Sequence, residues 1–336
     1  MILKPLPWHQ REFDQLAAAR KNLPHALLLR GPRGIGKLAF ARALSQLLLC
    51  ESGQVEDAGC GHCSACGWFE GGGHPDYRQI EPESATEAEH EEGEKKKAVT
   101  IGVDQIRALG AFVNVSAHRA GPKAVVIHPA EALNVNAANA LLKSLEEPPP
   151  GVHFLLVTHR PHQLLPTIRS RCQHIALHAP DPATATEWLA GQGARNPALA
   201  LAHVGDAPLL ALELNGSEYW GARAAFLRHL GGRELDVLAA GEAVRDCPIP
   251  HVVAWLQKWS YDLVHYRTLG RVRYNPDYAE VIACAAAEAD ALAALRFHRE
   301  MVKLQRVANH PLNPRLFLEQ VLLAYRDVVQ PQAALA

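Results

Sequence analysis

The first half of the chain carries short apolar runs that are bounded by charged residues, Gly or Pro. We interpret five of these runs as strands: HALLLRG (25–31), YRQIEP (77–82), KAVVIHP (123–129), HFLLVTH (153–159) and CQHIALH (172–178). Apolar residues follow one another in them more than they alternate with polar ones, which is typical of strands covered on both faces. Helical patterns separate the runs, so the sequence predicts a parallel α/β sheet within the first 176 residues or so.

The pattern changes near residue 179, at the segment APDPATATEWLAG, after which the strand signals stop. Segments rich in Ala and Leu follow, and Gly and Pro divide them into several helices. One segment carries a stripe with the spacing of a helix face, made of Val252, Trp255, Leu256, Trp259 and Leu263. The stripe predicts a helical bundle with both Trp side chains in its core, and a ligand platform is the less favoured alternative.

Composition and charge add limits to this picture. The chain has 336 residues, of which 48% are hydrophobic and 21% charged, and its formal net charge is -1. We therefore expect two globular domains with room for a small third, and any contact with nucleic acid has to be local or shared with partner subunits. No stretch resembles a signal peptide or a membrane span, so we expect a cytoplasmic protein. The segment 83–98, acidic and then lysine-containing, is interpreted as a surface insertion.

The segment LLLRGPRGIGKLAF (27–40) has the spacing of a phosphate-binding loop. Gly31, Gly34, Gly36 and Lys37 follow a predicted strand and precede a helical pattern. In that setting, backbone N–H groups, the helix N-terminus and the lysine can all face phosphates. The alternative is a tight strand-to-helix turn in which the lysine is incidental.

The residues that would hold Mg²⁺ beside this loop are missing. Position 38 is Leu, where a Ser or Thr hydroxyl normally binds the cation. His128 and Pro129 stand where an acidic pair would follow the strand, and Glu131 is displaced further along. Two defects at one metal predict slow or absent ATP hydrolysis, and they leave phosphate binding through Lys37 open.

Four of the seven cysteines are clustered. Cys60, Cys63 and Cys66 have two-residue spacings, and Cys50 precedes them at the end of the helical pattern that follows the loop. Thiolates in this spacing are typical ligands of a closed, structural Zn²⁺ site. Free or redox-active thiols are the alternative, and His62 or His74 could replace one sulfur.

An arginine lies at the end of the sheet region, in the step Ser-Arg-Cys at 170–172. Its position just before the last predicted strand could present Arg171 outward, toward a nucleotide site in a neighbouring subunit. The residues alone favour an ordinary salt bridge.

Taken together, these motifs resemble the clamp-loader branch of AAA+ proteins. The resemblance covers nearly the whole chain and rests on PWHQREFDQL, HALLLRGPRGIGK, CGHCSAC, NVNAANALLKSLEEPPPGVHFLLVTH, LLPTIRSRC and NHPLNPRLFLEQVLLAYR. It implies an AAA+ P-loop α/β domain (1–178) with the Cys₄ zinc module, a small helical lid (179–215) and a helical collar (216–336).

The same resemblance implies a function. The chain would be a noncatalytic subunit of the bacterial DNA polymerase III clamp loader, in a ring of five with gamma or tau and delta subunits. The ring loads the sliding clamp onto primed DNA with energy from ATP. Arg171 would act as an arginine finger in the ATP site of a gamma or tau neighbour, Thr158 would occupy a sensor position, and the lid segment VGDAPLLAL (204–212) lacks the sensing Arg of the motors.

This reading makes the chain part of a DNA-directed DNA polymerase holoenzyme without ATPase or polymerase activity of its own. ATP or ADP binding stays open, with a defective Mg²⁺ site. Two alternatives remain: an active gamma-like or tau-like ATPase motor, and a zinc-dependent nucleic-acid-binding protein.

Overall fold

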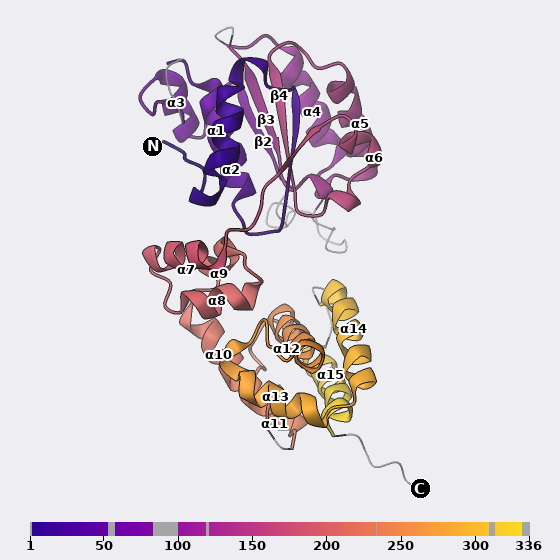
Figure 1. Cartoon of the computed structure of the whole chain (residues 1–336). Helices are drawn as coiled ribbons and strands as arrows, with labels where there is room; N and C mark the ends of the chain where they lie inside the picture. The colour runs from indigo at the N-terminus through magenta and orange to yellow at the C-terminus, as the bar shows by residue number, and fades with distance from the viewer. Residues whose placement is uncertain are drawn as a thin grey trace. The chain divides into compact units, whose positions relative to one another are not determined.

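The computed structural model describes residues 2–52, 58–82, 100–118, 121–232, 234–308 and 313–330 (Figure 1). They belong to two compact units, Met1–Pro180 and Asp181–Ala336. The predicted insertion at 83–98 lies outside the described residues. Within the described ranges, no helix is long and apolar enough to cross a membrane.

A five-stranded parallel sheet forms the centre of the first unit. Its strands are β1 (Ala26–Arg30), β2 (Tyr77–Ile80), β3 (Lys123–Ile127), β4 (Val152–Thr158) and β5 (Gln173–Ala176), in the order β2-β3-β4-β1-β5. All five predicted strands and their parallel direction are confirmed. The three central strands are almost continuously buried, whereas the edge strands β2 and β5 are partly exposed. This burial explains why the unbroken apolar runs are clearest in the central strands.

Helices cover both faces of this sheet, because successive strand side chains point to opposite faces. Leu28 points into a core shared with α4 (Val103–Asn114) and α5 (Val135–Glu146), whereas Leu27 and Leu29 point into a core shared with α1 and α2. Figure 1 shows these two pairs of helices on opposite sides of the strands. The other elements of this unit are η1 (Pro7–His9), α1 (Gln10–Ala18), η2 (Arg20–Asn22), α2 (Lys37–Leu49), α3 (Ser64–Glu70), η3 (Ala130–Ala132), η4 (Pro161–Gln163) and α6 (Pro166–Arg169).

The second unit is helical in its described residues, as the sequence predicts. Its elements are α7 (Pro182–Gly191), α8 (Pro197–Val204), α9 (Pro208–Glu213), α10 (Ser217–Leu230), α11 (Val237–Glu242), α12 (Ile249–Leu269), η5 (Pro276–Tyr278), α13 (Ala279–Glu288), α14 (Ala291–Val307) and α15 (Pro314–Val329). The predicted apolar stripe lies on α12, and both of its Trp side chains are buried in the core. The indole N–H of Trp259 donates to the Tyr325 hydroxyl at 2.7 Å, and that of Trp255 donates to the Tyr219 hydroxyl at 2.8 Å.

The division of this unit into a lid (179–215) and a collar (216–336) stays a prediction. Helices α7, α8 and α9 share a small apolar cluster of Ala185, Leu189, Ala200, Leu201 and Ala211. Trp220 of α10 packs against this cluster, and its Nε1 donates to the Leu214 carbonyl oxygen at 2.8 Å. The predicted lid therefore takes part of its core from the first helix of the predicted collar.

Candidate functional site

The predicted phosphate loop joins β1 to α2 at the carboxyl edge of the sheet. A Cβ at Gly31 would lie 2.2 Å from the carbonyl oxygen of Leu177, so only glycine fits where the loop passes the chain after β5. Gly36 caps α2 with a left-handed φ of 96°, a conformation that also favours glycine. Both positions explain why the loop needs these glycines in this spacing.

The loop lysine folds back onto the loop itself. Lys37 is 2% exposed, and its Nζ donates to the carbonyl oxygen of Gly31 at 2.8 Å and to that of Pro32. Burial lowers the pKa of Lys37 to about 8, and the nearby charge of Glu131 opposes this shift. The lysine thus has a structural role in this loop, whichever ligand the loop can take.

The positions that would hold Mg²⁺ are engaged in other contacts. Leu38 packs, partly buried, against the core beneath α1 and α2. His128 Nδ1 lies 3.0 Å from Glu81 Oε1. The Glu131 carboxylate accepts the backbone N–H of His159, at 3.0 Å to Oε1 and 3.3 Å to Oε2. Leu38, His128 and Pro129 therefore offer no pair of oxygen ligands at the positions where Mg²⁺ would be held.

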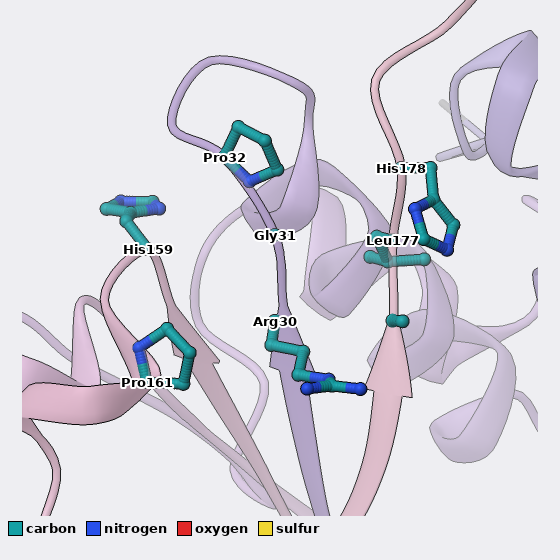
Figure 2. A pocket seen from close by; sticks show the side chains of 8 residues that line it. Arg30, Gly31, Pro32, His159, Pro161, Leu177 and His178 are labelled. Carbon is teal, nitrogen blue, oxygen red and sulfur yellow. The ribbon is translucent and has the colours of Figure 1, made fainter.

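A pocket of about 330 Å³ lies beside this loop, at the ends of β1, β4 and β5 (Figure 2). Figure 2 shows His159 and Pro161 on one side of Gly31 and Pro32, and Leu177 and His178 on the other. Among the predicted nucleotide-binding residues only Gly31 lines it; the full lining is Arg30, Gly31, Pro32, His159, Pro161, Ala176, Leu177 and His178. The pocket is therefore displaced from the lysine toward β5.

The predicted sensor residue does not face this pocket. Thr158 is fully buried, and its hydroxyl accepts the backbone N–H of Arg160 at 3.2 Å. The next residue, His159, lines the pocket instead. Burial, and to a smaller extent the charge on Lys37, lower the pKa of His159 to about 4, so its ring is neutral at physiological pH. The sequence analysis did not single out His159, because the resemblance placed the sensor at Thr158 and the strand pattern does not show which of the two side chains faces the pocket.

The four predicted cysteine ligands come together. The sulfurs of Cys50, Cys60, Cys63 and Cys66 all lie within 4.8 Å of one another. The distance is 4.0 Å between the sulfurs of Cys50 and Cys63 and 3.9 Å between those of Cys60 and Cys66. A tetrahedral Zn²⁺ with bonds of about 2.3 Å needs sulfur-to-sulfur distances of about 3.8 Å. The geometry therefore fits a four-thiolate metal centre.

Backbone groups around these sulfurs support the same fit. The N–H groups of Cys60, Cys63 and Cys66 each point at the sulfur of another cysteine, at 3.3 to 3.4 Å. Such donors stabilise thiolates, which are the ligand form of cysteine.

The two histidines that could have replaced a sulfur have other partners. His62 Nδ1 contacts the Cys60 carbonyl oxygen, and His74 Nδ1 accepts the N–H of Asp76. Among the described residues, only the four cysteines form a possible metal group.

The predicted finger lies on the surface in an ion pair. Arg171 follows α6, where its Nη1 donates to the Thr167 carbonyl oxygen at 3.0 Å and its Nη2 lies 2.5 Å from Glu146 Oε1. The side chains of Arg171 and Glu146 are 35% and 48% exposed. The next residue, Cys172, is buried in the core beneath α4 and α5, so one residue anchors the turn while its neighbour faces outward. Glu146 lies on a distant part of the chain, and no local pattern links it to this arginine.

Residues 9–181 match the family described as DNA polymerase III, delta subunit. The chain is also 40% identical to DNA polymerase III subunit delta' of Pseudomonas aeruginosa over 268 residues, which span 78% of this chain and 77% of that protein. The chain belongs to the delta' family of DNA polymerase III subunits. A delta' subunit of Yersinia pestis is 31% identical over 339 residues and is matched over 96% of each chain.

A solved structure of a DNA polymerase III gamma subunit-related protein from Thermotoga maritima is also similar. Its TM-score is 0.44 at 18% identity, with 95% of this chain and 99% of that chain covered. Membership of the delta' family, shown by the sequence matches, confirms the resemblance that the motifs predicted.

Proposed function

We propose that this delta' family member is a noncatalytic clamp-loader subunit, which helps ATPase neighbours place a sliding clamp on primed DNA. The observation that carries the proposal is that, in the described part of the chain, the usual Mg²⁺ ligands are missing beside a retained phosphate loop. The partly buried Leu38 packs against the core, and the Glu131 carboxylate accepts the backbone N–H of His159. Because ATP hydrolysis needs Mg²⁺ held by oxygen ligands, we infer that this chain does not turn over ATP itself.

Arg171 is the residue that we propose acts on a neighbour. Its ion pair with Glu146 is partly exposed, and surface pairs of this kind contribute only about 0 to 1 kcal/mol. Transfer of the guanidinium from Glu146 to a phosphate would therefore cost little. An arginine finger of this type accelerates phosphoryl transfer by about 10³ to 10⁵, so the arginine can matter greatly after assembly.

The proposed partners follow from the family. They are gamma or tau and delta subunits in a ring of five, the sliding clamp, and primed DNA bound by the assembled complex. A net charge of -1 agrees with DNA contacts that are shared among subunits. Such work in DNA replication implies a cytoplasmic location in bacteria.

We also propose that the four-cysteine centre holds structural Zn²⁺, which would tie the loop after α2 to the sheet unit.

The test is a reconstituted loader with tau, delta, clamp and primed DNA. We expect Arg171→Ala to lower clamp deposition and ATP turnover at the adjoining site at least about tenfold, with a smaller effect on the KM for ATP. The matched control is Arg107→Ala, because Arg107 is 72% exposed and also pairs with a surface carboxylate; we expect no change. Equal activity of the two variants would contradict the proposed finger.

Two further outcomes would favour other functions. ATP turnover by the isolated chain that Lys37→Ala abolishes would indicate an active motor. Selective DNA binding by the isolated chain that Cys63→Ser abolishes, with the fold retained, would indicate a zinc-dependent nucleic-acid-binding protein.

A further inference from the structure

The metal centre joins two parts of the first unit. Three of its sulfurs come from one short segment, the loop that leads into α3 and the first turn of α3, whereas the fourth comes from Cys50, directly after α2. The four sulfurs can bind one cation only while these two segments keep their relative positions. The position of Cys50 is therefore critical to the centre.

A guanidinium from a third part of the chain holds the end of α2. Nη2 of Arg20, in η2, donates to the Leu48 carbonyl oxygen at 3.0 Å and to the Cys50 carbonyl oxygen at 2.8 Å. Carbonyl groups at a helix C-terminus have no partner within the helix, and a cation there is favourable. Arg20 thus links the last helical turn to the first residue beyond it.

This link restrains Cys50 on its carbonyl side. On its other side, the Cys50 N–H donates to the Leu47 carbonyl oxygen at 3.4 Å, and the residue leaves the helix with extended backbone angles. With both backbone groups bonded away from the cluster, the thiol is the group that faces the other cysteines. It accepts the N–H of Cys60 at 3.3 Å.

The cysteine loop has a separate support. Gln46, one turn before Cys50 and 1% exposed, accepts the backbone N–H of Leu3 at 2.8 Å. A Cβ at Gly59 would lie 2.8 Å from Gln46 Cγ and 3.2 Å from Cys66 Sγ, so the loop packs directly on this face of α2. Because the loop packs on Gln46 without contacting Arg20, the bonds of Arg20 to Leu48 and Cys50 act on the Cys50 side of the centre.

We propose that Arg20 is a positioning residue of the metal centre, which keeps the Cys50 thiolate in place and thereby sets how long the metal is retained. The inference rests on the proposed zinc centre. Groups that orient metal ligands without touching the metal typically change metal affinity about 10- to 100-fold when they are replaced.

The experiment compares the full chain with Arg20→Ala and Arg20→Lys, and uses Lys21→Ala as control because Lys21 is the exposed neighbour on the same short helix. Zn²⁺ content is measured by elemental analysis, and Zn²⁺ release by transfer to a chromogenic chelator. We expect release about tenfold faster for Arg20→Ala and intermediate for Arg20→Lys, because an ammonium can still reach a carbonyl. Lys21→Ala should match the unchanged chain.

Co²⁺ in place of Zn²⁺ separates positioning from general stability. We expect the tetrahedral thiolate spectrum of the unchanged chain to weaken in Arg20→Ala, as the fourth sulfur withdraws, and to be partly restored in Arg20→Lys. Faster release with an unchanged Co²⁺ spectrum would contradict positioning and indicate simple destabilisation. If Arg20→Ala does not fold, Arg20→Lys decides by the same two measurements.

The two proposals fail in different ways. If the protein without any substitution contains no bound metal, both the proposed zinc centre and this inference are wrong. One bound metal per chain, with identical release and Co²⁺ spectra in all variants, would overturn the role of Arg20 and leave the zinc centre standing.

Discussion

The buried ammonium of Lys37 makes the stability of the sheet unit depend on pH in a defined direction. Burial lowers the pKa of this group from 10.5 to about 8. Between these two pH values the unfolded chain binds more protons at this site than the folded chain, so stability should rise with pH. Replacing the lysine by methionine removes the titration, and we expect the Lys37→Met variant to lack this rise.

The size of the effect follows from the two pKa values. Since each pKa unit corresponds to about 1.36 kcal/mol, the whole difference amounts to at most about 3.4 kcal/mol. Between about pH 7 and about pH 9.5, the same two values give a gain of about 2 kcal/mol in the free energy of unfolding. This gain should appear as the difference between the unchanged chain and Lys37→Met, because other titrating groups contribute equally to both.

A local probe is available for the measurement. The indole N–H of Trp8 donates to the carbonyl oxygen of Ile35 in the loop at 2.9 Å, so Trp8 reports on this region. Urea unfolding at the two pH values can be followed by ¹⁹F NMR of protein labelled with 5-fluorotryptophan, with Trp8→Phe to assign the signal. Lys143→Met is the control, because it removes the same charge from an exposed helix position.

One result would refute the reasoning. If the unchanged chain, Lys37→Met and Lys143→Met show the same change in unfolding free energy between the two pH values, burial does not lower the affinity of Lys37 for its proton. The hydrogen bonds to Gly31 and Pro32 would then replace water fully.

Three other predictions concern the same unit. Gly31→Ala should lower its stability by about 1 to 3 kcal/mol in urea unfolding, because the new Cβ would meet the Leu177 carbonyl oxygen at 2.2 Å; an unchanged midpoint would contradict the close approach. Leu38→Thr should not confer ATP turnover in a phosphate-release assay, because one hydroxyl does not replace the missing acidic pair at the end of β3; measurable turnover would show that the sequence defect is less severe than we infer. Cys63→Ser should abolish stoichiometric Zn²⁺ binding in elemental analysis, because the sulfur of Cys63 belongs to the four-thiolate group; retained binding at full stoichiometry would contradict that ligand set.

Patterns that depend on local order were predictable from the sequence. The continuous apolar runs gave the central strands, and the spacing on α12 placed Trp255 and Trp259 in the core. The two-residue spacing of Cys60, Cys63 and Cys66, with Cys50 before them, predicted a cluster that the structure brings together. In each case neighbours in sequence, or one helical turn apart, carry the signal.

Contacts between distant segments were not predictable in this way. Arg171 and its partner Glu146 are 25 positions apart in the sequence. The bond from Arg20 to Cys50 spans 30 positions. In the second unit, the nearly fully buried Arg223 pairs with Asp277 at 2.7 Å and contacts Asn275 at 2.8 Å. Charge pairs of this kind depend on the tertiary arrangement, so composition and periodicity do not reveal them.

Trp220 of α10 completes the apolar core of α7, α8 and α9, and this limits where segments can be exchanged between related subunits. If the predicted lid were transplanted between related subunits with its last residue at 215, it would leave behind Trp220, which packs against the apolar cluster of α7, α8 and α9. The donor would keep an exposed ring, and the recipient would gain an incomplete core. Chimaeras should therefore fold when the junction lies directly after Pro180, at the boundary between the two compact units. The helices from residue 181 onward should be exchanged together.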